Sequence, residues 1–68
     1  MSESVYKVIG LVGTSPASWE IAADNAVEIA STSLKDLRVA EIAKLDMTVE
    51  NGKVTDFRTR LKLSLKTD

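Results

Sequence analysis

The chain has 68 residues and a mass of 7.4 kDa, so we expect one small domain over residues 1–68. Hydrophobic residues make up 44% and charged residues 28%, with a net charge of −1, which excludes a disordered or coiled-coil chain. The near-zero net charge also argues against non-specific nucleic-acid binding, which needs a basic surplus. No apolar run approaches the roughly 20 residues of a membrane span, so we expect a cytoplasmic protein with no membrane partner.

Two residue types, Cys and His, are absent from the sequence. Without Cys there are no disulfides, thiolate nucleophiles or Cys-type zinc sites. Without His there is no Ser–His catalysis and no imidazole-ligated metal. The sequence therefore predicts a protein that is not an enzyme, and any metal it binds is a hard cation held by oxygen.

The small size of the chain predicts self-association. Below about 70–80 residues one core rarely supplies more than about 3–5 kcal/mol, and disulfides or a structural metal usually compensate. Disulfides and Cys- or His-ligated zinc are excluded by composition. Contacts with further copies of the chain are the remaining source of stability.

A first strand is expected over Ser4–Val12, where apolar residues occupy most positions of both faces. The following segment, Gly13–Pro16, breaks the strand. Ser15 is expected to cap a helix and Pro16 to occupy its first position. The helix is predicted over Pro16–Leu34, because mostly small apolar residues recur there with the 3.6-residue period: Trp19, Ala22, Ala23, Ala26, Ile29, Ala30 and Leu34.

Two long strands are predicted next, over Leu37–Val49 and Val54–Leu65. Asn51-Gly52 between them is the strongest turn signal in the chain. A two-residue turn there would set the apolar residues of one strand beside the polar residues of the next. We therefore expect a three-residue loop, Glu50–Gly52 with a glycine bulge, which aligns the two apolar sets.

The element order β-α-β-β predicts an α+β fold. A right-handed crossover leaves room for the last strand in the middle of a three-stranded antiparallel sheet, with the helix on one face. The strand over Leu37–Val49 spans roughly 43 Å and the helix roughly 28 Å. The hairpin therefore extends beyond the helix, and Met47, Val49 and Phe57 are expected to need a second copy to bury them.

Several segments together resemble the dodecin family over nearly the whole chain: Val5-Tyr6-Lys7-Val8-Ile9, Gly13-Thr14-Ser15-Pro16, Ser18-Trp19-Glu20 with Ala22-Ala23, and Arg38-Val39-Ala40-Glu41. The resemblance implies a hollow homododecamer in which a bent three-stranded sheet wraps one helix. It also implies binding of flavin, FMN or riboflavin, as a store and not as an enzyme substrate.

Two positions depart from the flavin-binding pattern of the family. Val39 stands where the resemblance implies a Trp that stacks on the flavin ring, and Arg58 stands where it implies a Gln that hydrogen-bonds the flavin edge. We therefore expect flavin binding to be weak or lost. The Arg38-Val39-Ala40 and Ser18-Trp19-Glu20 segments are similar to the calcium-dodecin branch, which implies Ca²⁺ as an alternative small ligand; a ligand-free scaffold is the third alternative.

Individual residues allow both structural and functional interpretations. Trp19 is either a core residue or a ligand stack, and we expect the core. Glu41 interrupts an apolar alternation, so a salt bridge to a basic residue of a neighbouring copy is expected. Arg58, Arg60 and Lys62 form a basic stripe on the strand face away from the helix. This stripe is expected to make ion pairs between subunits; the functional alternative is an anion site for a phosphate.

Acidic and oxygen-bearing residues lie on and before the helix. Glu20, Asp24 and Glu28 follow one line of the helix, which is either a solvated face, a contact for a basic neighbour or a cation site. Thr14 and Ser15 are expected to serve as helix-terminus residues. Together with Glu20 they are the candidate metal ligands, a role implied by the resemblance alone.

Overall fold

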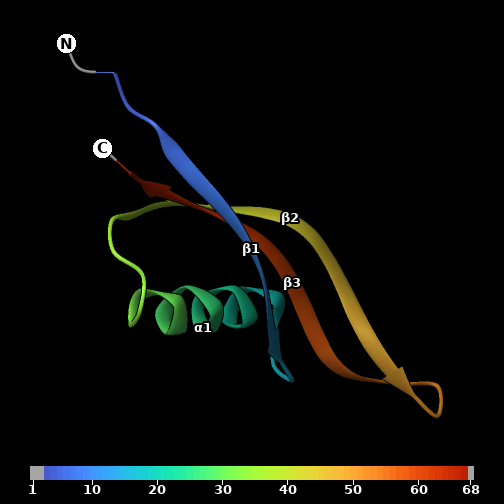
Figure 1. Ribbon diagram of the computed structural model, residues 1–68. Helices are drawn as coiled ribbons and strands as arrows, with labels where there is room; N and C mark the ends of the chain where they lie inside the picture. The colour runs from blue at the N-terminus through green and yellow to red at the C-terminus, as the bar shows by residue number, and fades with distance from the viewer. Residues whose placement is uncertain (1–2, 68) are drawn as a thin grey trace.

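The computed structural model describes residues 3–67. The elements follow in the order β1 (Tyr6–Ser15), α1 (Trp19–Ser31), β2 (Leu37–Glu50) and β3 (Lys53–Lys66). The three strands form one antiparallel sheet in the order β1-β3-β2, and α1 lies against one face of it (Figure 1). The predicted β-α-β-β order and α+β class are thus confirmed, as is the central position of the last strand.

The helix begins later than the sequence suggested. The N-cap is Ser18, whose hydroxyl accepts the Ile21 N–H at 3.0 Å, and not Ser15. Ser15 instead ends β1, where its buried hydroxyl accepts the Ala17 N–H at 3.0 Å. Both serines fit the capping pattern, but Ser15 is tied into β1 and the turn that follows it.

The helix also ends three residues before Leu34. The hydroxyls of Ser31 and Thr32 donate to the carbonyls of Val27 and Ile29, at 2.8 and 2.7 Å, so side chains take part in the last turn. The helix leaves its regular path as this run of hydroxyl residues begins. No helix within residues 3–67 is long and apolar enough to cross a membrane.

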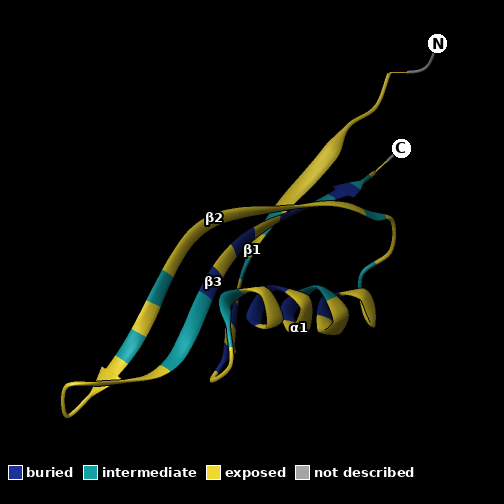
Figure 2. Cartoon of the chain, turned by 180° about the vertical axis from the view of Figure 1, so that it is seen from behind, coloured by how far each residue is buried: buried dark blue, intermediate teal, exposed yellow. Residues whose placement is uncertain are grey.

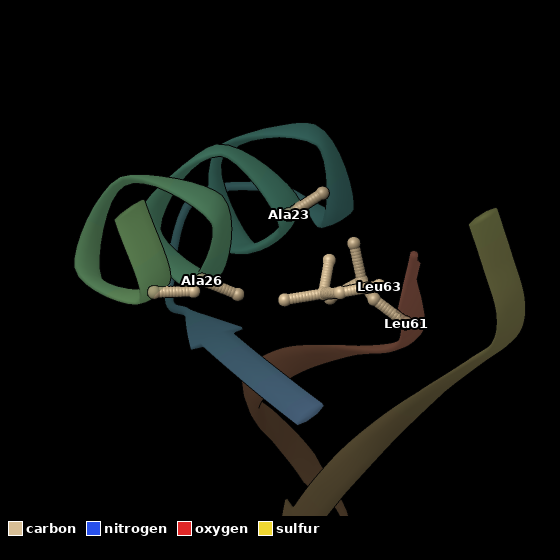
Figure 3. Close-up of a cluster of buried hydrophobic side chains, with 5 residues drawn as sticks. Ala23, Ala26, Leu61 and Leu63 are labelled. Carbon is tan, nitrogen blue, oxygen red and sulfur yellow. The ribbon is translucent and has the colours of Figure 1, made fainter. Parts of the chain in front are cut away.

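The core lies between the alanines of α1 and the leucines of β3. Figure 3 shows Ala23 and Ala26 opposite Leu61 and Leu63, and all four side chains are buried. Because strand residues alternate between faces, the residues between the buried ones point away from the helix. We call that side of the sheet the open face; around its middle it carries Gly10, Val12, Arg58, Arg60 and Lys62.

The helix lies so close to β1 that only glycine fits at the contact. A Cβ atom on Gly13 would lie 2.1 Å from the carbonyl oxygen of Ala22 and 3.0 Å from the Cβ of Ala26. The backbone of β1 therefore rests directly on the small side of α1. The alanine stripe predicted from the periodicity performs this function.

The hairpin turn has two residues, so the predicted three-residue loop is wrong. Asn51 and Gly52 both have positive φ, 52° and 76°, and Glu50 pairs directly with Lys53. Asn-Gly suits such a turn because both central residues need positive φ. The register then shifts at Thr55, an extra residue on β3, and this bulge performs the alignment that the loop was expected to provide.

A second register shift, at Ala43, changes which residues of β2 face the helix. Beyond this bulge Glu41 pairs with Lys62, and Val39 pairs with Ser64, so both lie on the open face. The sequence alternation had placed Glu41 among apolar residues. The bulge explains that exception, because it moves Glu41 onto the polar face, where its side chain is exposed.

The long hairpin extends past the helix, as predicted. The molecule measures 54 × 20 × 14 Å, and Figure 2 shows β2 mostly exposed. Leu45, Met47 and Val49 are 51%, 46% and 60% exposed. Phe57 departs from the prediction, because its half-buried ring packs edge-on against Trp19 with the centroids 4.9 Å apart.

The Gly13 contact predicts that Gly13→Ala destabilises the fold. The new methyl group must displace the Ala22 backbone, and overpacking of this kind costs about 1–3 kcal/mol. Denaturant unfolding at one fixed protein concentration measures the loss. Gly10→Ala is the matched control, because its Cβ would meet only the Leu61 carbonyl oxygen at 3.9 Å; equal midpoints for both variants would contradict the prediction.

Candidate functional site

A charged cluster occupies the open face where β2 and β3 run beyond the end of β1. Asp46 pairs with Arg58 in the sheet register. The Arg58 Nε donates to Asp46 Oδ1 at 2.7 Å and its Nη2 donates to Oδ2 at 3.1 Å, a two-pronged pair. Arg60 Nε lies 4.0 Å from Asp46 Oδ2. Asp46 therefore holds the basic stripe that the sequence assigned to contacts between subunits.

The pair shifts the protonation of both partners. The hydrogen bond from Arg58 is the main cause that lowers the pKa of the Asp46 carboxyl below its usual value, and the charges of Arg58, Arg60 and Lys44 act in the same direction. Asp46 in turn raises the pKa of Arg58, again mainly through the hydrogen bond. Asp46 stays ionised and Arg58 stays engaged at any pH near neutrality.

The single tryptophan is engaged by the hairpin next to this cluster. The Trp19 indole N–H donates to the Asp46 carbonyl oxygen at 2.9 Å, and the Thr59 hydroxyl donates to the Trp19 carbonyl oxygen at 2.9 Å. The ring also makes the edge contact with Phe57. Trp19 thus fastens the start of α1 to β2 and β3, in line with its expected structural role.

The two positions that the resemblance assigned to flavin do not meet within one chain. Val39 pairs with Ser64, six residues along β3 from Arg58, which corresponds to roughly 20 Å. Val39 is 53% exposed on the open face, in the same row as the exposed Val8. A ligand that touches both positions must therefore take them from two different copies.

The candidate ion-pairing residue Glu41 stands opposite Lys62 and is exposed. Its expected salt bridge to a neighbouring copy stays a prediction. Within its own chain Arg58 already has a carboxylate partner in Asp46, which the sequence did not single out. Arg60 keeps most of its donor groups for other partners, because its contact with Asp46 is long.

The candidate metal ligands are not gathered into a cation site. Ser15 is buried with its hydroxyl engaged by the Ala17 N–H, and Thr14 lies beside Arg58 in the sheet. Glu20 is exposed in the first turn of α1. Residues 3–67 contain no group of three or more acidic side chains placed to hold a metal. A Ca²⁺ ion, which takes six to eight oxygen ligands, would need further oxygens from elsewhere.

Comparison with known proteins identifies the family. The model of the Dodecin family matches residues 5–68. The chain belongs to the dodecin family. It is 52% identical over 64 residues to the calcium dodecin of Mycobacterium tuberculosis, covering 93% of this chain and 89% of that protein.

Solved dodecin structures share the fold over the whole length. The dodecin of Streptomyces coelicolor superposes with a TM-score of 0.91 at 35% identity, covering 100% of this chain and 97% of that one. The M. tuberculosis calcium dodecin, described as calcium-chelating with a novel calcium-binding site, superposes with a TM-score of 0.83 at 48% identity, covering 96% and 93%. The resemblance to dodecins predicted from the sequence is confirmed.

The Asp46–Arg58 pair predicts a low carboxyl pKa that depends on Arg58. A carboxyl group with a depressed folded-state pKa stabilises the protein above its unfolded value of about 3.9, and this stability is lost as the pH falls through the folded pKa. Carbon-detected NMR titration should place the Asp46 pKa below the usual range in the wild type. In Arg58→Gln it should rise.

The matched control is Arg38→Gln, which removes a cation paired with Asp36 at 3.7 Å on a different part of β2. That variant should leave the titration of Asp46 unchanged. An Asp46 pKa that does not respond to Arg58→Gln would contradict the role given to the pair.

Proposed function

We propose that this dodecin assembles as a homododecameric shell that binds or sequesters a small ligand without catalysing a reaction. The carrying observation is the apolar surface of the hairpin overhang, made by Leu45, Met47 and Val49, which the short helix leaves uncovered. Apolar surface of this kind marks a protein contact. The absence of Cys and His from the sequence supports a binding protein over an enzyme.

Assembly predicts a solution mass of twelve times 7.4 kDa and an unfolding midpoint that rises with protein concentration. Val49→Asp places a charge in the overhang and should lower the mass measured by light scattering. Ser33→Asp introduces the same charge at an exposed loop position and should leave the mass unchanged. A wild-type protein that is folded and monomeric at micromolar concentration would refute the proposal.

The flavin site is proposed to be weak or lost. Stacking needs a flat aromatic partner, whereas Val39 and Val8 offer branched aliphatic surfaces. Arg58 cannot accept a hydrogen bond, and its guanidinium is held by Asp46, so it is a poor substitute for an amide that both donates and accepts. Both properties reduce the affinity for a neutral flavin ring.

Calcium binding is the alternative ligand function, and the similarity to a calcium dodecin favours it. The oxygens of Thr14, Glu20, Asp24 and Glu28 are the candidates. The helix carboxylates are exposed, so carboxylates of several copies could be combined around one ion. Such a site would form only in the assembled protein.

One pair of titrations separates the two ligands. Riboflavin fluorescence should be quenched at least about tenfold more weakly by the wild type than by Val39→Trp combined with Arg58→Gln, a difference of about 1.4 kcal/mol. Calorimetric titration with Ca²⁺ should give a saturating heat that Glu20→Gln reduces and Mg²⁺ does not reproduce. Tight riboflavin quenching by the wild type would show that Val39 and Arg58 do not weaken the flavin site.

A further inference from the structure

A hollow on the open face lies apart from both candidate ligand sites. It has a volume of about 640 Å³ and is lined by residues of all three strands. Its lining is mostly apolar with three cations around it: Gly10, Leu11, Val12, Ala43, Lys44, Arg60, Leu61 and Lys62. The hollow therefore combines an apolar floor with a positively charged rim.

The floor of the hollow contains a glycine that the fold itself does not require. Gly10 lies in the middle of β1, and its φ is outside the left-handed region that favours glycine. An added Cβ would meet only the Leu61 carbonyl oxygen, at an ordinary contact distance of 3.9 Å. A glycine inside a strand weakens it and commonly marks a place where a ligand or another backbone approaches closely.

The rim of the hollow brings like charges together. Lys44 pairs directly with Arg60 in the sheet register, and Lys62 follows on the same face of β3. Like charges at directly opposite positions destabilise a sheet. Within residues 3–67 neither Lys44 nor Lys62 forms an ion pair, and the nearest carboxylate to Arg60 is already held by Arg58. An anion between these cations would remove the repulsion.

We propose that this hollow binds a small phosphorylated ligand, with the phosphate between Lys44 and Arg60 and the apolar part of the ligand over Gly10 and Val12. A phosphate group matches the forked donors of Arg60 and carries enough charge to neutralise two cations. The apolar floor takes a small organic body. This inference rests on the proposed ligand-binding function and assigns it a chemical class of ligand.

The test uses the assembled wild-type protein and two probes, pyrophosphate and phenyl phosphate, in calorimetric titrations. Lys44→Gln should weaken both probes about tenfold, because it removes a charge-assisted hydrogen bond. Lys53→Gln removes the same charge at the hairpin turn and should leave both affinities unchanged. Gly10→Val fills the floor and should weaken phenyl phosphate more than pyrophosphate.

Light scattering on each variant separates ligand binding from assembly. Loss of probe binding with an unchanged mass supports the inference, whatever that mass is. A lower mass for Gly10→Val or Lys44→Gln would overturn it, because a second copy would then occupy the hollow. Absence of binding by the wild type, or equal effects of Lys44→Gln and Lys53→Gln, would overturn it as well while leaving the proposed shell intact.

Discussion

The close contact between β1 and α1 determines most of this structure. At Gly13 the strand backbone lies directly on Ala22 and Ala26, with no side chain between them. This contact requires small residues on the helix, so the buried apolar core consists of four alanines and three leucines. Such a core is small for a stable domain. The helix is also short relative to the sheet, so the far half of the hairpin has no cover from its own chain (Figure 1).

The sequence predicted what depends on local periodicity and failed where one residue changes the register. The alanine stripe and the turn at Asn51-Gly52 gave the element order, the strand order and the overhang. The bulges at Thr55 and Ala43 leave no comparable signal, because any residue type can be the extra one in a strand. A one-residue shift moves every following side chain to the other face, which is why Glu41 and Val39 lie on the open face.

The candidate site shows the same division. The basic stripe on β3 and the structural role of Trp19 followed from alternation and helix periodicity. The Asp46 carboxylate was missed because its position opposite Arg58 follows only from the shifted register after Thr55. The separation of Val39 from Arg58 was missed because the resemblance assigns residues to a site without saying which copy supplies each one. Both are facts of pairing between strands, which a single sequence does not encode locally.

The charges of the two faces connect the ligand proposals. Residues of one sign gather on each side of the subunit: Lys44, Arg60 and Lys62 surround the hollow on the open face, whereas Glu20, Asp24 and Glu28 line the exposed side of α1. When thin subunits close into a shell, one face lines the interior and the other meets the outer solvent. A cavity walled by one sign of charge concentrates ligands of the opposite sign. The orientation of the helix in the shell therefore decides whether the interior attracts phosphorylated ligands or cations.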